Sequence, residues 1–198
     1  ASDLINNKAF EDNCKKIFHN IQNSKVKFVR FACHHHEVFL ISRYIKWLKN
    51  RGLKIFVNIM QISELDLKKI NRICIYLKKL NVDVVYIADS LGSLSPQQTK
   101  NIIKLFKFSF PTNIGIHAHN NLGLALKNSI TASENGANWL DCTITGMGRG
   151  PGNLKTEEIL SIFGEKKDRQ IVKFLIKKLF IKLKTHYKWG PNKYYALA

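Results

Sequence analysis

Ile114-Gly-Ile-His-Ala-His-Asn-Asn-Leu122 is the stretch from which both the fold and a site can be predicted. It follows a turn former, Pro111, and its β-branched residues predict a short strand. Residues two apart in a strand point to the same face, so His117 and His119 are expected to project together. Two imidazoles at the end of one strand can hold a divalent metal ion. A pair of surface or packed histidines is the alternative that the motif alone leaves open.

The rest of the chain alternates between strand and helix patterns around this stretch. Strands are predicted over 26–32, 53–60, 82–88, 114–118 and 138–145, and helices over 8–22, 38–50, 63–80, 122–135, 155–163 and 168–184, with one more opening at Pro96. Ser63 is the expected N-cap of its helix, and the apolar residues of 168–184 are expected to face the core. Such alternation predicts a parallel sheet with right-handed crossovers.

Polar residues gather where each predicted strand ends, for example at Asp89–Ser93 and Thr145–Asn153. A β/α barrel and an open flavodoxin-like sheet both place a ligand at this edge. Five polar strand ends converging on one site favour the barrel. The predicted fold class is therefore α/β, a partial TIM (β/α)8 barrel, because only five of its eight units are visible. Such a piece would leave two edge strands and much apolar surface uncovered.

Composition narrows the class of protein. The chain of 198 residues carries a formal charge of +18, but only six of its 32 basic residues are Arg, and the lysines are spread over every predicted helix. This favours a solvated lysine-rich surface over a nucleic-acid interface. No apolar run is long enough to span a membrane. The four cysteines form no close pair, which favours reduced core thiols and a cytoplasmic location.

Three motifs together resemble a known superfamily. His117-Ala-His119-Asn-Asn-Leu-Gly, Asp89-Ser-Leu-Gly-Ser and Gly146-Met-Gly-Arg-Gly-Pro-Gly-Asn153 are similar to the hydroxymethylglutaryl-CoA lyase-like metal-dependent TIM barrels. This superfamily includes 4-hydroxy-2-oxovalerate aldolases, isopropylmalate and homocitrate synthases, and the pyruvate carboxylase transferase domain. The resemblance covers residues from about 26 to 163, and it matches the five visible units to the fourth to eighth strands of the barrel.

The resemblance implies roles for particular residues. His117, His119 and Asn153 match metal ligands, with a helix N-cap as the alternative for Asn153. Asp89, Ser90 and Gly146 match positions near the substrate, and an N-cap is the alternative for Ser90. The implied metal is Mn²⁺ or Mg²⁺, with Zn²⁺ not excluded, and it would support carbon–carbon lyase chemistry on 2-oxo acids through a pyruvate enolate.

The loop Gly146–Asn153 is closer to the aldolase branch than to the synthases. An acyl-CoA-dependent Claisen synthase and a non-catalytic barrel remnant remain the alternatives. The loop His34–His36 is expected near the site, with a second metal cluster as the less favoured reading. The resemblance also implies a small-molecule 2-oxo acid substrate, and either a homo-oligomer or an aldehyde dehydrogenase partner. Neither nucleic acid nor a membrane is expected as a partner.

One departure from the superfamily concerns the start of the barrel. Its first strand ends in an Arg-Asp-Gly type motif that supplies an Asp ligand and an Arg, and no such motif occurs in the sequence. Catalytic residues therefore stay unassigned. We expect one incomplete barrel domain over 1–198, with a C-terminal helix and tail over 165–198, from a longer aldolase; the chain alone is expected to be inactive. Tyr194 and Tyr195 are candidates to reach the site.

Overall fold

A computed structural model of the chain describes residues 10–109 and 113–191. Its strands form one parallel sheet in the order β1-β2-β3-β4-β5. Neighbouring strands in this sheet are also neighbours in the sequence, which right-handed helical crossovers permit. The strands are β1 Phe28–Cys33, β2 Lys54–Ile59, β3 Val84–Asp89, β4 Asn113–Ala118 and β5 Trp139–Leu140.

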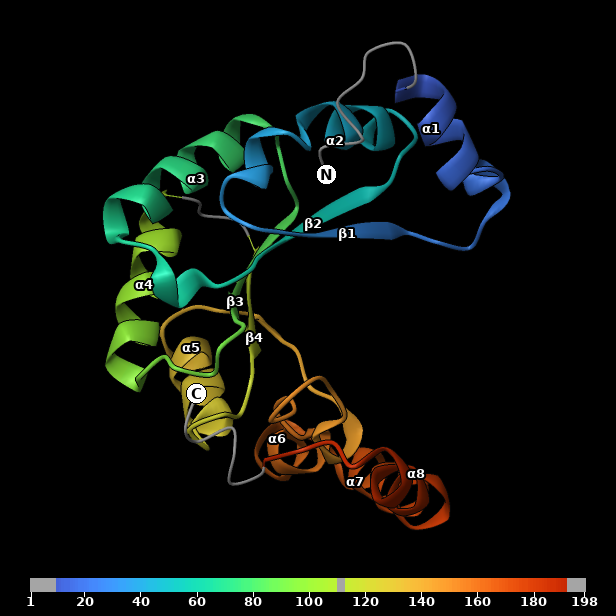
Figure 1. Cartoon of the computed structure of the whole chain (residues 1–198), viewed down its shortest axis with the longest axis vertical. Helices are drawn as coiled ribbons and strands as arrows, with labels where there is room; N and C mark the ends of the chain where they lie inside the picture. Colours follow the sequence, from blue (N-terminus) through green and yellow to red (C-terminus); the bar gives the residue numbers. More distant parts are fainter. Residues whose placement is uncertain (1–9, 110–112, 192–198) are drawn as a thin grey trace.

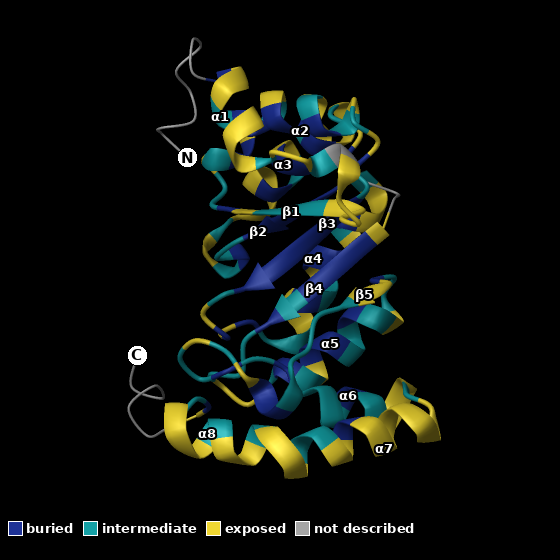
Figure 2. Ribbon diagram, turned by 90° about the vertical axis from the view of Figure 1, so that its right-hand side faces the viewer, coloured by how far each residue is buried: buried dark blue, intermediate teal, exposed yellow. Residues whose placement is uncertain are grey.

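Helices connect the strands and follow one another in an arc along one side of the sheet (Figure 1). A second group, made by the C-terminal helices, lies at the end of the molecule farthest from the first helix, and Figure 2 shows the same separation. The helices are α1 Phe10–Ile17, α2 Ser42–Lys49, α3 Leu67–Lys79, α4 Pro96–Ser109, α5 Ala125–Glu134, α6 Thr156–Phe163, α7 Lys166–Leu175 and α8 Ile181–Tyr187.

The core lies between the sheet and this arc of helices. All six residues of β3 are buried, and Ile70, Ile103 and Phe106 from α3 and α4 pack in the same apolar cluster as Val85. A strand buried on both faces is typical of a parallel sheet covered by helices. The central strands in Figure 2 are accordingly almost entirely in the buried colour.

The sheet is strongly curved, and two contacts across its concave face demonstrate this. Arg30 in β1 forms an ion pair with Asp141, which follows β5, at 2.5 Å, and the ring of Phe56 in β2 lies 5.2 Å from that of Trp139 in β5. In a flat sheet the first and fifth strands would be roughly 19 Å apart. An open doubly wound sheet also reverses its strand order, and this sheet does not. The predicted partial TIM barrel is therefore confirmed.

The concave face has a layer of aromatic side chains near the start of the strands. Phe28 stacks on Phe56 with ring centroids 4.6 Å apart. Phe28 is nevertheless 50% exposed and Trp139 is 41% exposed, and both line a cavity of about 580 Å³. The expectation that apolar surface stays uncovered is thus confirmed for this layer.

The fifth strand is shorter than the predicted 138–145. After Leu140 the chain leaves the sheet, and the N–H of Thr143 bonds to the carbonyl of Leu154 at 2.9 Å. A 3₁₀ turn over Ile144–Gly146 follows at once. The N–H of Thr143, which would extend the strand, is therefore used by the residues just after the glycine-rich loop Gly146–Asn153.

The start of α3 was predicted wrongly. Its N-cap is Asp66, whose carboxylate accepts a hydrogen bond from the N–H of Lys69 at 2.7 Å. Ser63 instead lies in a 3₁₀ turn over Ile62–Glu64. Asp66 is as good a cap as Ser63 and lies closer to the first apolar turn of the helix.

The C-terminal helix was also predicted only in part. A π-helical turn over Ile176–Phe180 separates α7 from α8. Val172 is buried, but Ile171 and Leu179, which were expected to face the core, are 48% and 47% exposed. One extra residue in a turn rotates the following segment by about 100°, so no single apolar face continues through it.

Three cysteines are in the core, as predicted: Cys14, Cys33 and Cys74 are buried, and Cys142 is half-buried. Burial raises the pKa of both Cys33 and Cys74 to about 12. Within the described residues, no helix has the length and apolar character needed to cross a bilayer. The tail residues Tyr194 and Tyr195 lie outside the described residues.

Candidate metal centre

The two histidines of the His-x-His motif lie beside each other at the end of β4. Their ring centroids are 5.2 Å apart and the ring planes make an angle of 74°. His117 pairs with Ala88 in the sheet register, and the N–H of His119 bonds to the carbonyl of Asp89 at 3.3 Å. The period of two along the strand therefore brings both imidazoles to the C-terminal edge of the sheet, as the sequence predicts.

Asn153 is brought to the same place by an antiparallel bridge with His119. Its amide nitrogen donates to the carbonyl of Met147 at 3.1 Å, which fixes the orientation of the side chain. Its amide oxygen is buried and has no hydrogen-bond partner among the described residues. A buried acceptor without a partner is costly, so the oxygen is poised to accept a ligand. The N-cap alternative is wrong, because Lys155 is the residue that caps α6.

The glycine-rich segment is shaped around this amide. A Cβ at Gly148 would lie 2.5 Å from the amide nitrogen of Asn153, and a Cβ at Gly152 would lie 2.5 Å from the carbonyl oxygen of Gly146. Gly146 and Gly152 also have φ of +69° and +83°, which residues with a Cβ rarely adopt. The predicted substrate residue Gly146 therefore serves at least to let the loop turn back onto Asn153.

Asp141 is a site residue that the sequence reasoning missed. Its Oδ2 accepts a hydrogen bond from Nδ1 of His117 at 2.8 Å and forms the ion pair with Arg30. Desolvation works to raise the pKa of Asp141, but the hydrogen bonds from His117 and Arg30 outweigh it and lower the pKa. The carboxylate is therefore ionised over the range in which most proteins function.

His119 is kept neutral by its surroundings. Burial is the main cause, and the neighbouring His117 and the positive charge of Arg149 add to it, so that the pKa of His119 falls to about 4. A metal ion binds only the neutral form of imidazole. His119 is thus in the ligand-competent state at neutral pH.

The two residues predicted to contact substrate after β3 have clear local roles. Asp89 is fully buried, and its carboxylate oxygens accept hydrogen bonds from the N–H groups of Ser93 at 3.0 Å and Leu94 at 3.1 Å. Burial raises the pKa of Asp89 in spite of these donors. Its described contacts shape the loop after β3.

Ser90 points to the neighbouring strand end. Its hydroxyl oxygen accepts a hydrogen bond from the N–H of Gln61 at 3.0 Å, just beyond β2. It is not a helix N-cap, since the following helix, α4, begins at Pro96. The hydroxyl proton of Ser90 is not used by this bond and remains able to donate.

The three consecutive histidines after β1 do not form a metal cluster. His34 and His36 stack with ring centroids 5.8 Å apart, and the N–H of His34 bonds to the carboxylate of Glu37 at 2.9 Å. In the described part of the chain, no group of three His, Cys, Asp or Glu side chains is arranged to hold a metal. The second-cluster reading is therefore wrong for these residues.

The donor set at the strand end nevertheless fits a divalent cation. It offers two imidazoles, of which His119 is neutral and His117 is held through Nδ1, and an amide oxygen that lacks a partner. Mixed nitrogen and oxygen donors of this kind suit Mn²⁺ or Zn²⁺. Among the described residues, no carboxylate joins these side chains as a further ligand.

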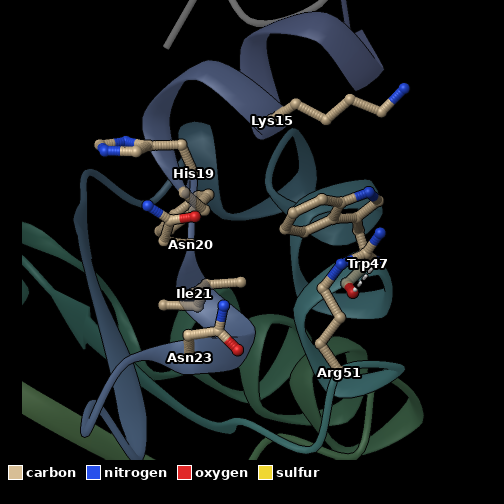
Figure 3. Close-up of a pocket in the computed structure, with 8 residues that line it drawn as sticks. Lys15, His19, Asn20, Ile21, Asn23, Trp47 and Arg51 are labelled. Atoms are coloured by element: carbon tan, nitrogen blue, oxygen red, sulfur yellow. Dashed lines mark hydrogen bonds between the residues drawn. The ribbon is translucent and has the colours of Figure 1, made fainter.

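A separate pocket of about 280 Å³ lies between α1 and α2 (Figure 3). The guanidinium of Arg51, which lines this pocket, already has partners. It lies 3.5 Å from the ring centroid of Trp47 and donates a hydrogen bond to the carbonyl of Trp47 at 3.0 Å. Of the described residues that line this pocket, none has a buried side-chain nitrogen or oxygen without a hydrogen-bond partner, in contrast to Asn153 at the strand-end site.

Comparison with known proteins gives consistent matches. Residues 4–178 match the HMGL-like family model. A 4-hydroxy-2-oxovalerate aldolase of Nocardia farcinica is 33% identical over 138 residues, and one of Bacillus thuringiensis is 30% identical over 156 residues. The matches cover 70% and 77% of this chain but only 40% and 46% of the relatives, so the chain spans less than half the length of either.

Solved structures give the same picture of the fold. The N-terminal domain of a putative aldolase from Bacteroides vulgatus superposes with a TM-score of 0.83 at 31% identity, covering 94% of this chain and 63% of that one. An HMG-CoA lyase from Bacillus subtilis superposes with a TM-score of 0.72 at 17% identity, covering 83% of this chain and 67% of that one.

Proposed function

The chain belongs to the HMGL-like family, and from that premise we propose that it provides the metal-holding part of a divalent-metal-dependent aldolase that acts on 2-oxo acids. The curated relatives named as 4-hydroxy-2-oxovalerate aldolases support a carbon–carbon lyase of this type. The single observation that carries the proposal is the meeting of His117, His119 and Asn153 at one strand end.

Each of these three side chains has a distinct part in holding the cation. His117 offers the ring nitrogen that does not face Asp141, His119 offers a neutral imidazole, and Asn153 offers the amide oxygen that is otherwise unpartnered. The cation that we propose is Mn²⁺, with Mg²⁺ and Zn²⁺ as the alternatives, and when bound it would supply Lewis-acid stabilisation of negative charge on the oxygens of a 2-oxo acid. The remaining ligands and the catalytic base come from outside the described residues.

Substrate contacts are proposed for the neighbouring strand ends. The free hydroxyl proton of Ser90 can donate to a carboxylate or keto oxygen, and Gly146 contributes by letting its loop turn back onto Asn153. Asp89 contributes through the shape of its loop, whose N–H groups it fixes. The positive charge of the chain, +18, attracts an anionic substrate of this class.

Metal binding is the first test and needs only the 198-residue chain. Titration with Mn²⁺, followed by the electron paramagnetic resonance signal of the free ion, is expected to show one site. Each of His117→Ala and His119→Ala should weaken binding at least about tenfold. His19→Ala, a change at an exposed histidine just after α1, is the matched control and should leave the affinity unchanged.

Activity is the second test and uses the protein that contains this chain. Pyruvate release from 4-hydroxy-2-oxovalerate should disappear with a chelator and return with Mn²⁺. Full activity of the His117→Ala/His119→Ala double variant would overturn the metal assignment. Thiol release from acetyl-CoA in the presence of a 2-oxo acid, without pyruvate release, would favour the Claisen synthase instead.

A further inference from the structure

A carboxylate links the two ends of the curved sheet to the metal centre. One oxygen of Asp141, Oδ2, accepts a hydrogen bond from Nδ1 of His117 at 2.8 Å and forms an ion pair with Nη2 of Arg30 at 2.5 Å. Arg30 comes from β1, His117 from β4, and Asp141 follows β5. The three side chains are partly buried, with 28%, 25% and 22% exposed, so water competes only weakly for these bonds.

Arg30 is itself held in place by two further contacts. Its guanidinium lies 3.8 Å from the ring centroid of Tyr86, and Nη2 also donates to Oδ1 of Asn58 at 3.2 Å. Asn58 and Tyr86 are partners in the register of β2 and β3. The guanidinium is therefore fixed by a ring, an amide and a carboxylate, which leaves it little freedom to turn away from Asp141.

The tautomer of His117 follows from this arrangement. An ionised carboxylate can only accept, so the proton of neutral His117 must be on Nδ1. The lone pair is then on Nε2, the nitrogen that does not face Asp141. A free imidazole would divide itself between two tautomers and several ring orientations, and only some of these present a lone pair to a cation.

We propose that Asp141 is a positioning residue that fixes His117 as the Nδ1–H tautomer for metal binding, and that Arg30 anchors Asp141 from the opposite edge of the sheet. This inference rests on the proposed function, because it assigns the partners behind one proposed ligand. It explains why a half-buried ion pair spans the concave face at the level of the histidines rather than at the surface, where such pairs contribute little.

The direct test is the tautomer of His117 in the metal-free chain. Long-range proton–nitrogen correlation spectra near neutral pH should show Nδ1–H for His117 in the wild type. In Asp141→Asn the new amide can donate to the ring, so the signal should move toward the Nε2–H form. A mixed or Nε2–H pattern in the wild type, or an unchanged pattern in Asp141→Asn, would overturn the inference, whatever the metal affinity is.

Metal affinity gives the second readout. Asp141→Asn should raise the Kd for Mn²⁺ about 10- to 100-fold, the usual cost of losing a partner behind a histidine ligand. Asp141→Glu keeps the charge and should recover part of the affinity. The matched control is Asp83→Asn, which removes a carboxylate that pairs with Lys49 at 3.0 Å and is 31% exposed at the other end of the sheet. It should leave the Kd within about twofold of the wild-type value.

The outcomes separate this inference from the proposed function. If the tautomer behaves as stated but the wild-type chain binds no Mn²⁺, the proposed metal function fails and the positioning role stands. If Mn²⁺ binds and Asp141→Asn changes neither tautomer nor Kd, the positioning role fails alone. Should Asp141→Asn not fold, Arg30→Lys replaces it; loss of the guanidinium fork should weaken Mn²⁺ binding by a smaller factor, and an unchanged Kd would overturn the anchoring role.

Discussion

Gly115 leaves the space that Tyr86 fills on the concave face. A Cβ at this position would lie 2.3 Å from Cε1 and 2.4 Å from Cδ1 of the Tyr86 ring. The two residues are partners in the register of β3 and β4. The Tyr86 ring in turn contacts the guanidinium of Arg30, which pairs with Asp141. The position of this ion pair therefore depends on the absence of a side chain at Gly115.

Gly115→Ala should therefore destabilise the chain by about 1–3 kcal/mol through overpacking. Urea unfolding followed by circular dichroism measures the change. Placing the same substitution in a Tyr86→Leu background removes the ring that causes the clash, so the cost of Gly115→Ala should fall by at least about half. Equal costs in the two backgrounds would show that the ring is not responsible.

His119 makes the stability of the metal-free chain sensitive to acid. Its pKa is about 4 in the folded chain, below the ordinary value of 6.5, so the unfolded state binds the proton first as the pH falls. The stability that comes from keeping His119 neutral is therefore fully present above about pH 6.5 and is lost as the pH falls from about 6.5 to about 4. The direction follows from burial, which disfavours the charged imidazolium.

His119→Gln should reduce the loss of stability with falling pH, because the glutamine side chain does not titrate. Urea midpoints at several pH values between about 7 and 4, measured with a chelator present, give the slope. His19→Gln, at an exposed position, is the matched control and should keep the wild-type slope. If the two variants have the same slope, burial of His119 does not contribute to acid sensitivity.

At the scale of the elements, the glycine-rich loop Gly146–Asn153 and the preceding Thr145 form one segment, which is held by contacts to residues remote in sequence. Thr145 has φ of +56°, a strained value for a residue with a branched side chain. Its N–H donates to the carboxylate of Glu157 at 3.0 Å, and its carbonyl accepts from Nε1 of Trp189 at 3.2 Å. Both peptide groups around the strained residue are thus fixed by α6 and by the segment after α8.

Trp189→Phe removes the indole donor and should loosen the segment. The exposed Arg149 lies within it, so native-state trypsin cleavage after this residue is the measurement. Loss of one hydrogen bond of about 1 kcal/mol should raise the open population, and with it the cleavage rate, about fivefold. Glu157→Gln should act in the same direction, whereas Glu134→Gln, on the exposed face of α5, should not change the rate. A cleavage rate unaffected by Trp189→Phe would show that the hydrogen bond from Trp189 to Thr145 does not hold the segment closed.

The elements also show what could be predicted from the sequence. The five strands and the placing of His117 and His119 follow from local rules, the period of two and the turn formers between apolar runs. Asp141 could not be found in this way. Alternation places it on the inner face beyond β5, but only the curvature of the sheet brings it to Arg30, 111 positions earlier in the chain. The π-helical turn over Ile176–Phe180 likewise has no signature that a period of 3.6 reveals.

At the scale of the whole molecule, the net charge of +18 opposes the compact state. Like charges are brought closer together on folding, and dissolved salt screens them. The screening length falls from about 30 Å at 0.01 M to about 10 Å at 0.1 M, which is within the dimensions of the molecule. Salt would weaken the attraction between Arg30 and Asp141 and so destabilise the fold, but this ion pair is partly buried and is screened less than the exposed charges.

Added sodium chloride should therefore stabilise the chain. We expect a gain of about 1 kcal/mol between these concentrations, equivalent to a rise in Tm of about 2–4 °C. The control is a variant in which four exposed lysines of the C-terminal helices become glutamine, which lowers the net charge by four while keeping a similar helix propensity; they are Lys173, Lys177, Lys178 and Lys182. Its Tm should begin higher at low salt and rise less steeply, because less repulsion remains to be screened. A Tm that falls with salt in the wild type would mean that ion pairs, rather than net repulsion, dominate its electrostatic free energy.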